Sequence, residues 1–274
     1  MARSDAPIGV FDSGVGGLTV LRALSDALPA QDFIYLGDTA RLPYGTKSAD
    51  TVSRYSLQCA QALLERGIGS LVVACNTASA SALGSLGARY PHLPVIGVIE
   101  PGAKAAVEAS RSQHIAVIAT EGTINGGAYQ TEIRRRNPAA RILPRACSMF
   151  VALAEEGWTS GPVAEVVARR YLDPLFAGDD PPDTLVLGCT HFPILAAAIR
   201  AVLPADVRIV DSAATTAQTM AMQMAPPPDG SPGALSARGR ITWLATDDAA
   251  RFARVGGRFF GAELNAAAVE IIDL

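Results

Sequence analysis

Two cysteines stand in sequence strings that resemble one another. The strings are Leu71-Val-Val-Ala-Cys75-Asn-Thr and Leu185-Val-Leu-Gly-Cys189-Thr-His, and each predicts a buried strand that ends at its cysteine. A thiol with an ordinary pKa of about 8.5 supplies thiolate near neutral pH when a base or a helix N-terminus lies beside it. Two such groups in matching halves of a fold would face one another. Cys75 and Cys189 therefore predict proton transfer at opposite faces of one carbon atom.

Polar clusters follow several predicted strands, at the positions where parallel sheets bind ligands. Asp12 and His191 belong to these clusters and are the bases expected beside the two cysteines. Five clusters at equivalent places predict one site that is divided between two similar halves. The clusters are Asp12-Ser13-Gly14, Pro43-Tyr44-Gly45, Cys75-Asn76-Thr77, Thr120 with Thr123, and Cys189-Thr190-His191.

Other glycine, histidine and cysteine residues predict structure rather than chemistry. The segment Gly14–Gly17 lacks both GxGxxG and GxxxxGK followed by Ser or Thr, and a turn that lets a helix pack closely on a sheet explains it equally well. His92 and His114 are expected in solvated loops. Cys59 falls at a helical spacing and is expected in the core, and Cys147 precedes an apolar run, where packing explains it.

Short β-branched runs alternate with helical stretches, which predicts an α/β fold with mainly parallel sheets. The two halves look alike, so we expect two similar doubly wound domains related by internal pseudo-symmetry, with the active site in the cleft between them. Residues 1–98 with 211–274 are predicted to form one domain, and residues 99–210 the other. The predicted strands are Ile8–Phe11, Phe33–Leu36, Leu71–Ala74, Val95–Val98, Ile115–Ala119, Arg141–Leu143, Leu185–Leu187 and Arg208–Val210.

The last fifty residues are too few to form a domain of their own. Ala225–Gly233 contains four prolines and predicts a surface loop, because proline cannot continue a helix. Beyond it, Ile241–Ala245 predicts a strand and Asp248–Phe260 a helix. This tail is expected to pack back onto the first half of the chain.

Composition excludes several classes of protein. The chain has 274 residues, a formal net charge of -3 and 49% apolar residues, which is typical of a globular protein without a basic nucleic-acid-binding face. The sequence contains no run of about 18 consecutive apolar residues, so no membrane-spanning helix is predicted. The four cysteines form no CxxC pair, so neither a structural zinc site nor a disulfide framework is expected. The first predicted strand begins after seven residues, which leaves no room for a secretion signal and favours the cytoplasm.

Four further strings are informative together: Phe11-Asp-Ser-Gly-Val-Gly-Gly-Leu18, Asp38-Thr-Ala-Arg-Leu-Pro-Tyr-Gly45, Ala74-Cys-Asn-Thr-Ala-Ser79 and Gly188-Cys-Thr-His191. They resemble the glutamate racemases of the Asp/Glu racemase superfamily. The resemblance covers nearly the whole chain and includes Gly122-Thr-Ile124 and Glu155-Glu-Gly157. The chain departs from the family at Gly126, where serine is common, and at Ser148 and Ala152, which replace prolines.

This resemblance implies a two-base proton transfer on glutamate without pyridoxal phosphate or any other cofactor, supplying D-glutamate for peptidoglycan. Cys75 would deprotonate D-glutamate with help from Asp12, and Cys189 would deprotonate L-glutamate with help from His191. Glu155 would contact the substrate ammonium or act from behind the site, and both alternatives stay open, as does a homodimer. The substrate-binding residues implied are Asp12, Ser13, Pro43, Tyr44, Gly45, Asn76, Thr77, Thr120, Thr123, Glu155 and Thr190.

Two alternatives compete with this interpretation. Another racemase of the superfamily, acting on aspartate or a hydantoin, would keep both cysteines and change the groups around the distal end of the substrate. A two-domain protein that only binds a small molecule would need the cleft and not the thiols.

Overall fold

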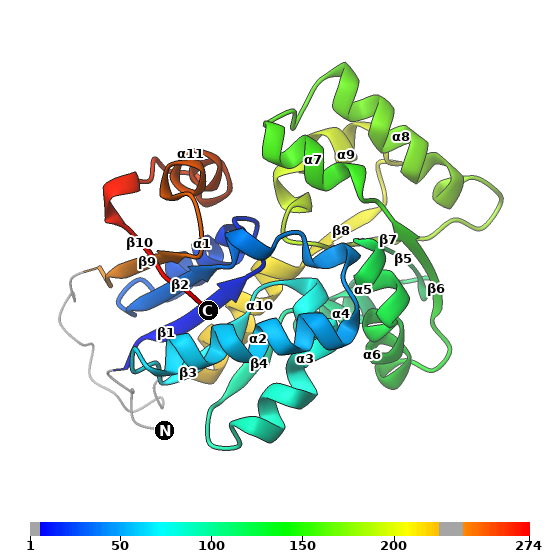
Figure 1. The fold of residues 1–274 in the computed structure, drawn as a ribbon. Helices are drawn as coiled ribbons and strands as arrows, with labels where there is room; N and C mark the ends of the chain where they lie inside the picture. Colours follow the sequence, from blue (N-terminus) through cyan, green and yellow to red (C-terminus); the bar gives the residue numbers. More distant parts are fainter. Residues whose placement is uncertain (1–5, 225–237) are drawn as a thin grey trace.

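Short buried strands alternate with helices along the chain and form two separate sheets (Figure 1). The structure is a computed structural model that describes residues 6–224 and 238–274. The predicted loop Ala225–Gly233 lies outside these residues. Every strand pairing in both sheets is parallel, and the interior strands are buried because helices cover both faces. The predicted α/β fold with parallel sheets is confirmed.

The two sheets share one strand order. Within the described residues, the first contains six strands in the order β10-β9-β2-β1-β3-β4, and the second contains four in the order β6-β5-β7-β8. If each half is numbered from its own first strand, both contain the order 2-1-3-4, which agrees with the predicted pseudo-symmetry. The strands are β1 (Ile8–Asp12), β2 (Phe33–Gly37), β3 (Ser70–Val73), β4 (Val95–Gly97), β5 (His114–Ala119), β6 (Arg141–Ala146), β7 (Thr184–Gly188), β8 (Arg208–Asp211), β9 (Ile241–Ala245) and β10 (Val269–Ile271).

Amphipathic helices supply the outer layers. Leu18, Leu21 and Leu24 are fully buried along one face of α1, as their spacing predicts. No helix among the described residues is both long and apolar enough to cross a membrane. The α-helices are α1 (Leu18–Ala27), α2 (Ala49–Leu64), α3 (Asn76–Arg89), α4 (Ile99–Ala109), α5 (Glu121–Gly126), α6 (Ala128–Arg136), α7 (Met149–Glu156), α8 (Pro162–Phe176), α9 (Ala196–Val202), α10 (Ser212–Met224) and α11 (Ala249–Phe260), and the 3-10 turns are η1 (Thr39–Arg41), η2 (Tyr44–Thr46), η3 (Phe192–Leu195) and η4 (Ala266–Ala268).

The tail extends the first sheet. Strand β9 pairs with β2, β10 pairs with β9, and α11 packs against α1. Helix α10, which precedes the tail, packs against both α1 of the first half and α4 of the second. The domain boundaries predicted at residues 98 and 211 stay predictions, and the second falls at the helix that contacts both halves.

One sequence-based expectation about the sheet is wrong. His114 is the first residue of β5 and is buried, whereas a solvated loop was expected. The reason is that His114 already belongs to the sheet, where it pairs with Arg141 of β6. Strand β5 lies between β6 and β7, so its residues are covered by neighbouring elements.

The packing of α11 generates a stability prediction. Phe252 is fully buried, and its ring centroid lies 6.0 Å from that of Tyr35 in β2. Phe252→Ala should lower the free energy of unfolding by about 3–5 kcal/mol, since a buried aromatic ring is lost and a cavity remains. Urea denaturation measures this change. Met222→Ala is the control, because that side chain is 74% exposed, and it should change the free energy by less than about 0.5 kcal/mol.

Candidate active site

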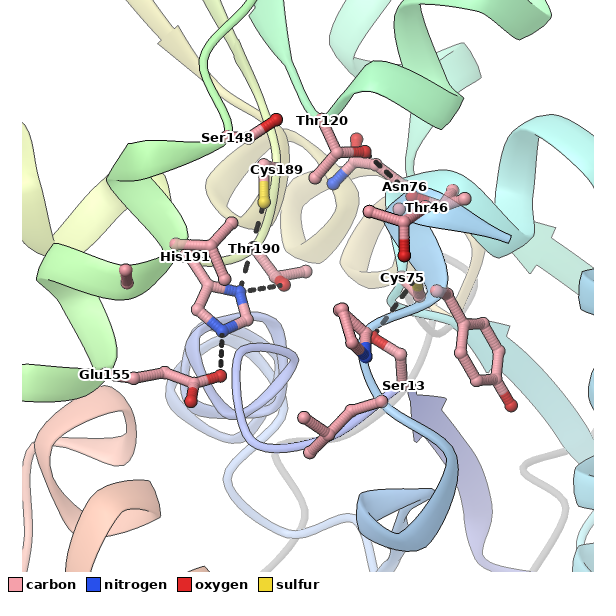
Figure 2. Close-up of a pocket in the computed structure, with 17 residues that line it drawn as sticks. Ser13, Thr46, Cys75, Asn76, Thr120, Ser148, Glu155, Cys189, Thr190 and His191 are labelled. Atoms are coloured by element: carbon pink, nitrogen blue, oxygen red, sulfur yellow. Dashed lines mark hydrogen bonds and ion pairs between the residues drawn. The ribbon is translucent and has the colours of Figure 1, made fainter. Parts of the chain in front are cut away.

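A cavity of about 330 Å³ lies between the carboxyl ends of the two sheets (Figure 2). Its size suits a small organic molecule. The first half contributes nine lining residues and the second half eight, so the site belongs to neither half alone. The lining residues are Ser13, Leu42, Pro43, Tyr44, Gly45, Thr46, Cys75, Asn76, Thr77, Thr120, Ser148, Val151, Ala152, Glu155, Cys189, Thr190 and His191.

Both cysteines of the matching strings reach this cavity, each from the end of a strand. Figure 2 shows Cys75 beside Ser13 and Cys189 beside His191, on different sides of the cavity. Cys75 caps the N-terminus of α3, where its Sγ accepts a hydrogen bond from the Ala78 amide at 3.4 Å. Its thiol donates to the Ser13 hydroxyl at 3.7 Å. Both cysteines therefore border one cavity, as the matching strings predict.

The two sulfur atoms have different electrostatic surroundings. Burial raises the pKa of Cys75 to about 12, and the nearby Asp12 carboxylate adds to this shift, while the Ala78 amide and Ser13 oppose it. Cys75 is therefore a thiol at neutral pH. Cys189 instead has the imidazole of His191 beside it, with Sγ and Nδ1 3.9 Å apart.

His191 is held as a cation. Burial acts to lower its pKa, but the hydrogen bonds with Cys189 and Glu155 outweigh burial and raise the pKa to about 10. Nε2 lies 3.2 Å from Glu155 Oε1, and Nδ1 also lies 3.4 Å from the Thr190 hydroxyl. A negative charge that develops on Cys189 is stabilised by this neighbouring cation.

Glu155 serves both as a wall of the cavity and as a partner of charged residues. The hydrogen bond from His191 is the main cause that lowers the pKa of Glu155, and Arg251 contributes further. Its second carboxylate oxygen, Oε2, accepts from Arg251 Nη2 at 2.9 Å. Both carboxylate oxygens are thus engaged within the protein, while the side chain still borders the cavity.

Asp12 lies behind the cavity wall. Burial raises the pKa of its carboxyl, and the His191 cation opposes this shift. Oδ2 accepts from the Gly14 amide at 3.1 Å, and Oδ1 has no hydrogen-bond partner among the described residues. No hydrogen bond joins Asp12 to Cys75, so the predicted assistance to that thiol stays a prediction.

Three threonine hydroxyls join the two halves beside the cavity. Thr77 lies 3.0 Å from Thr120 and 3.1 Å from Thr123, and the latter two are 3.0 Å apart. Thr123 completes this triangle without lining the cavity itself. Asn76 accepts a hydrogen bond from Tyr129 at 2.8 Å through Oδ1, whereas its buried Nδ2 has no partner among the described residues. The Asn76 amide is therefore a donor available to a ligand.

The loop that contains Pro43 and Gly45 is anchored from behind. The Tyr44 hydroxyl donates to the buried carboxylate of Asp38, which also pairs with Arg41 Nε at 2.7 Å and accepts from Thr246 at 3.0 Å. Tyr44 lines the cavity while Asp38 engages its hydroxyl, and its predicted part in substrate binding stays a prediction.

Glycine turns allow the halves to approach closely. A Cβ atom on Gly16 would lie 2.4 Å from both Thr190 Oγ1 and His191 Nδ1, and one on Gly45 would lie 2.8 Å from Thr120 Cβ. The Thr19 hydroxyl crosses the same contact to the Thr190 carbonyl at 3.1 Å. Gly16 thus lets the two halves meet. Gly17, where a Cβ atom would lie 2.4 Å from Asp12 Cβ at the end of β1, lets the start of α1 pack closely on the sheet, as expected.

Five lining residues were missed in the sequence. Ser148, Val151 and Ala152 share one face of α7 with Glu155, at spacings of three, four and seven residues, so the helical period was the available signal. Thr46 directly follows the predicted Pro43–Gly45 cluster, and Leu42 precedes it. Among the described residues, no three His, Cys, Asp or Glu side chains are grouped so that they could hold a metal ion.

Comparison with known proteins identifies the class to which this site belongs. The sequence profile described as Asp/Glu/Hydantoin racemase matches residues 8–220, and the chain belongs to this family. A curated relative, the glutamate racemase of Geobacter metallireducens, is 51% identical over 257 residues, which cover 94% of this chain and 93% of the relative. The sequence resemblance to glutamate racemases and the predicted isomerase class are confirmed.

Solved structures agree with this assignment over the whole chain. The glutamate racemase of Francisella tularensis in complex with D-glutamate has a TM-score of 0.86 at 34% identity. That of Thermus thermophilus in complex with β-chloro-D-alanine has a TM-score of 0.85 at 43% identity. In both cases the match covers 98% of this chain and 98% of the other, which confirms the two-domain fold.

The close contact at Gly16 generates a prediction about activity. Gly16→Ala should lower kcat at least about tenfold, because the added methyl group, 2.4 Å from His191 Nδ1 and Thr190 Oγ1, forces the two halves apart at the site. Steady-state kinetics measure the loss. Gly84→Ala is the matched control within α3, since a Cβ there meets nothing within 4 Å, and it should leave kcat unchanged. Equal kcat values for the two variants would contradict the importance of this contact.

Proposed function

We propose that the protein interconverts L- and D-glutamate by a two-cysteine proton transfer without a cofactor, and so supplies D-glutamate for peptidoglycan in the cytoplasm. One observation carries this proposal: Cys75 and Cys189 end matching strands in two similar sheets and border the same small cavity. The relatives named glutamate racemase, one of them solved with D-glutamate, support glutamate as the substrate.

The electrostatics support a reaction in which the two sulfur atoms exchange roles. With L-glutamate, the Cys189 thiolate, stabilised by the His191 cation, removes the α-proton. The Cys75 thiol, protonated at neutral pH, delivers a proton to the opposite face of the carbanion. The products are D-glutamate, a Cys189 thiol and a Cys75 thiolate. D-glutamate reacts with this second form in reverse, and proton exchange with water restores the first.

The difficult part of this reaction is the carbanion, because an amino-acid α-proton is far less acidic than a thiol. Preorganised hydrogen-bond donors must stabilise the charge that develops. The free Asn76 amide, the hydroxyls of Thr77 and Thr120, and the backbone amides at the start of α3 border the cavity for this purpose. We assign these groups to the substrate carboxylates, together with Ser13, Gly45 and Thr190.

Solvent isotope incorporation tests the reaction directly. Purified protein in deuterated water, without added cofactor, should convert either glutamate enantiomer and place deuterium at the α-carbon of the product. Polarimetry and mass spectrometry follow the two changes. Turnover of aspartate or a hydantoin in place of glutamate would assign the protein to another branch of the family. A protein that binds glutamate and exchanges no α-proton would contradict catalysis altogether.

Single cysteine variants test the two-base scheme. Cys75→Ser and Cys189→Ser should each lower kcat for racemisation by at least about a thousandfold, because a serine hydroxyl is far less acidic than a thiol. Cys147→Ser is the matched control: this cysteine is buried outside the cavity, and serine keeps its hydrogen bond to the Arg145 carbonyl. The control should stay active, and near-normal turnover by either of the other variants would exclude the scheme.

A further inference from the structure

The tail helix reaches the site from outside the cavity. Arg251 of α11 lies 2.9 Å from Glu155 Oε2, and Arg258, two turns further along α11, donates to the Glu155 backbone carbonyl at 2.9 Å. Figure 1 shows α11 on the side of the molecule that faces α7. Helix α11 belongs to the tail of the first sheet, whereas α7 follows the second strand of the second sheet. Arg251 and Arg258 therefore connect the two halves at Glu155.

Four groups form an unbroken chain from the protein surface to one sulfur atom. The distances are 2.9 Å from Arg251 to Glu155, 3.2 Å from Glu155 to His191, and 3.9 Å from His191 to Cys189. The Arg251 side chain is 48% exposed, that of Glu155 is 19% exposed and that of His191 is 9% exposed. The chain therefore becomes steadily more buried toward the sulfur.

The ion pair between Arg251 and Glu155 is expected to contribute little to the stability of the fold. The pair is partly exposed on the Arg251 side, and such ion pairs contribute little to stability, because water screens them and the side chains lose entropy. Glu155, however, must keep one oxygen on His191, and without a second partner its carboxylate could rotate toward the cavity or toward solvent. Arg251 fixes the second oxygen and so fixes the first.

We propose that Arg251 is a positioning residue that holds Glu155 against His191 and thereby serves the proton transfer at Cys189 and not the one at Cys75. This inference rests on the proposed function. Cys75 is not connected to these four groups, since the hydrogen bonds of its sulfur are to the Ser13 hydroxyl and the Ala78 amide. Removing Arg251 therefore slows one of the two proton transfers.

The groups that surround these four residues come from β1, β7, α11 and the turn that precedes α11. Asp12, at the end of β1, faces His191 from the first sheet, and Cys189 follows β7. Phe259 of α11 covers the imidazole, with 5.0 Å between the ring centroids. Asp247 and Asp248 border a second cavity, of about 150 Å³, together with Arg251 and Glu155. Arg251 and Glu155 therefore border this second cavity together with two further carboxylates.

The test uses substrates that carry deuterium at the α-carbon. Arg251→Gln should lower kcat/KM by about tenfold, the effect of losing a hydrogen bond to a charged group. The loss must be equal in both directions, because two enantiomers have an equilibrium constant of one. The primary isotope effect on kcat/KM should rise with α-deuterated L-glutamate, since removal of its deuterium by Cys189 becomes more rate-limiting. The isotope effect should fall with α-deuterated D-glutamate. In that direction Cys75 removes the deuterium, and the slowed step is the delivery of a proton from Cys189 to the carbanion, so deuterium removal limits the rate less.

Two matched variants complete the experiment. Arg251→Lys keeps a cation beside Glu155 and should restore most of the activity and the wild-type isotope effects. Arg254→Gln removes the same charge one turn along α11, where no carboxylate of the described residues is paired with it, and should behave as wild type. Thermal unfolding of all variants verifies that they are folded.

The outcomes separate the two proposals. Isotope effects that change in opposite directions with the two enantiomers support the role of Arg251. Isotope effects that stay unchanged or move together, or an Arg251→Gln variant that equals Arg254→Gln, overturn it while leaving the two-cysteine reaction intact. Failure of the wild-type protein to racemise glutamate would instead refute the proposed function.

Discussion

The close approach of two sheets at their carboxyl ends is the constraint on which the rest of the structure depends. Neither half could build this cavity alone, because each contributes one of the two sulfur atoms. Side chains at the contact are therefore either absent, as at Gly16 and Gly45, or paired across it, as with Thr77 and Thr120. Small residues and hydroxyls let two parallel sheets meet without excluding the space for a ligand between them.

Burial of charge in this contact explains the polar network. Asp12, His191 and Glu155 carry ionisable groups in a region with little water, where an unpaired charge costs several kcal/mol. The cation of His191 therefore lies between the two acids, and its pKa rises to about 10 in spite of burial. Glu155 is in turn paired with Arg251 at the surface. The paired charges therefore continue from the buried His191 through Glu155 to Arg251, whose side chain is in contact with solvent.

Much of this organisation can be predicted from the sequence, for physical reasons. Strands buried on both faces are continuous apolar runs, so Leu71–Val73 and Leu185–Leu187 can be recognised as strands in the sequence. The polar residues that follow them are then predicted at the carboxyl end of the sheet. A contact between exposed faces of two helices leaves no such pattern. Glu155 and Arg251 are 96 positions apart, and nothing in either helix period indicates that they meet. The sequence likewise does not indicate that the Tyr44 hydroxyl donates to the buried carboxylate of Asp38.

Two sheets of like topology have thus produced two unlike surroundings for the same chemical group. Cys75 lies at the start of a long helix near a carboxylate, and burial together with that charge keeps it protonated. Cys189 is followed only by a short 3-10 turn, so a cationic imidazole supplies the positive potential that a helix N-terminus would otherwise provide. In the proposed two-base reaction, one sulfur atom must donate a proton while the other accepts one. The unlike surroundings make the two sulfur atoms chemically distinct, because Cys75 lies near a carboxylate and Cys189 lies beside an imidazole.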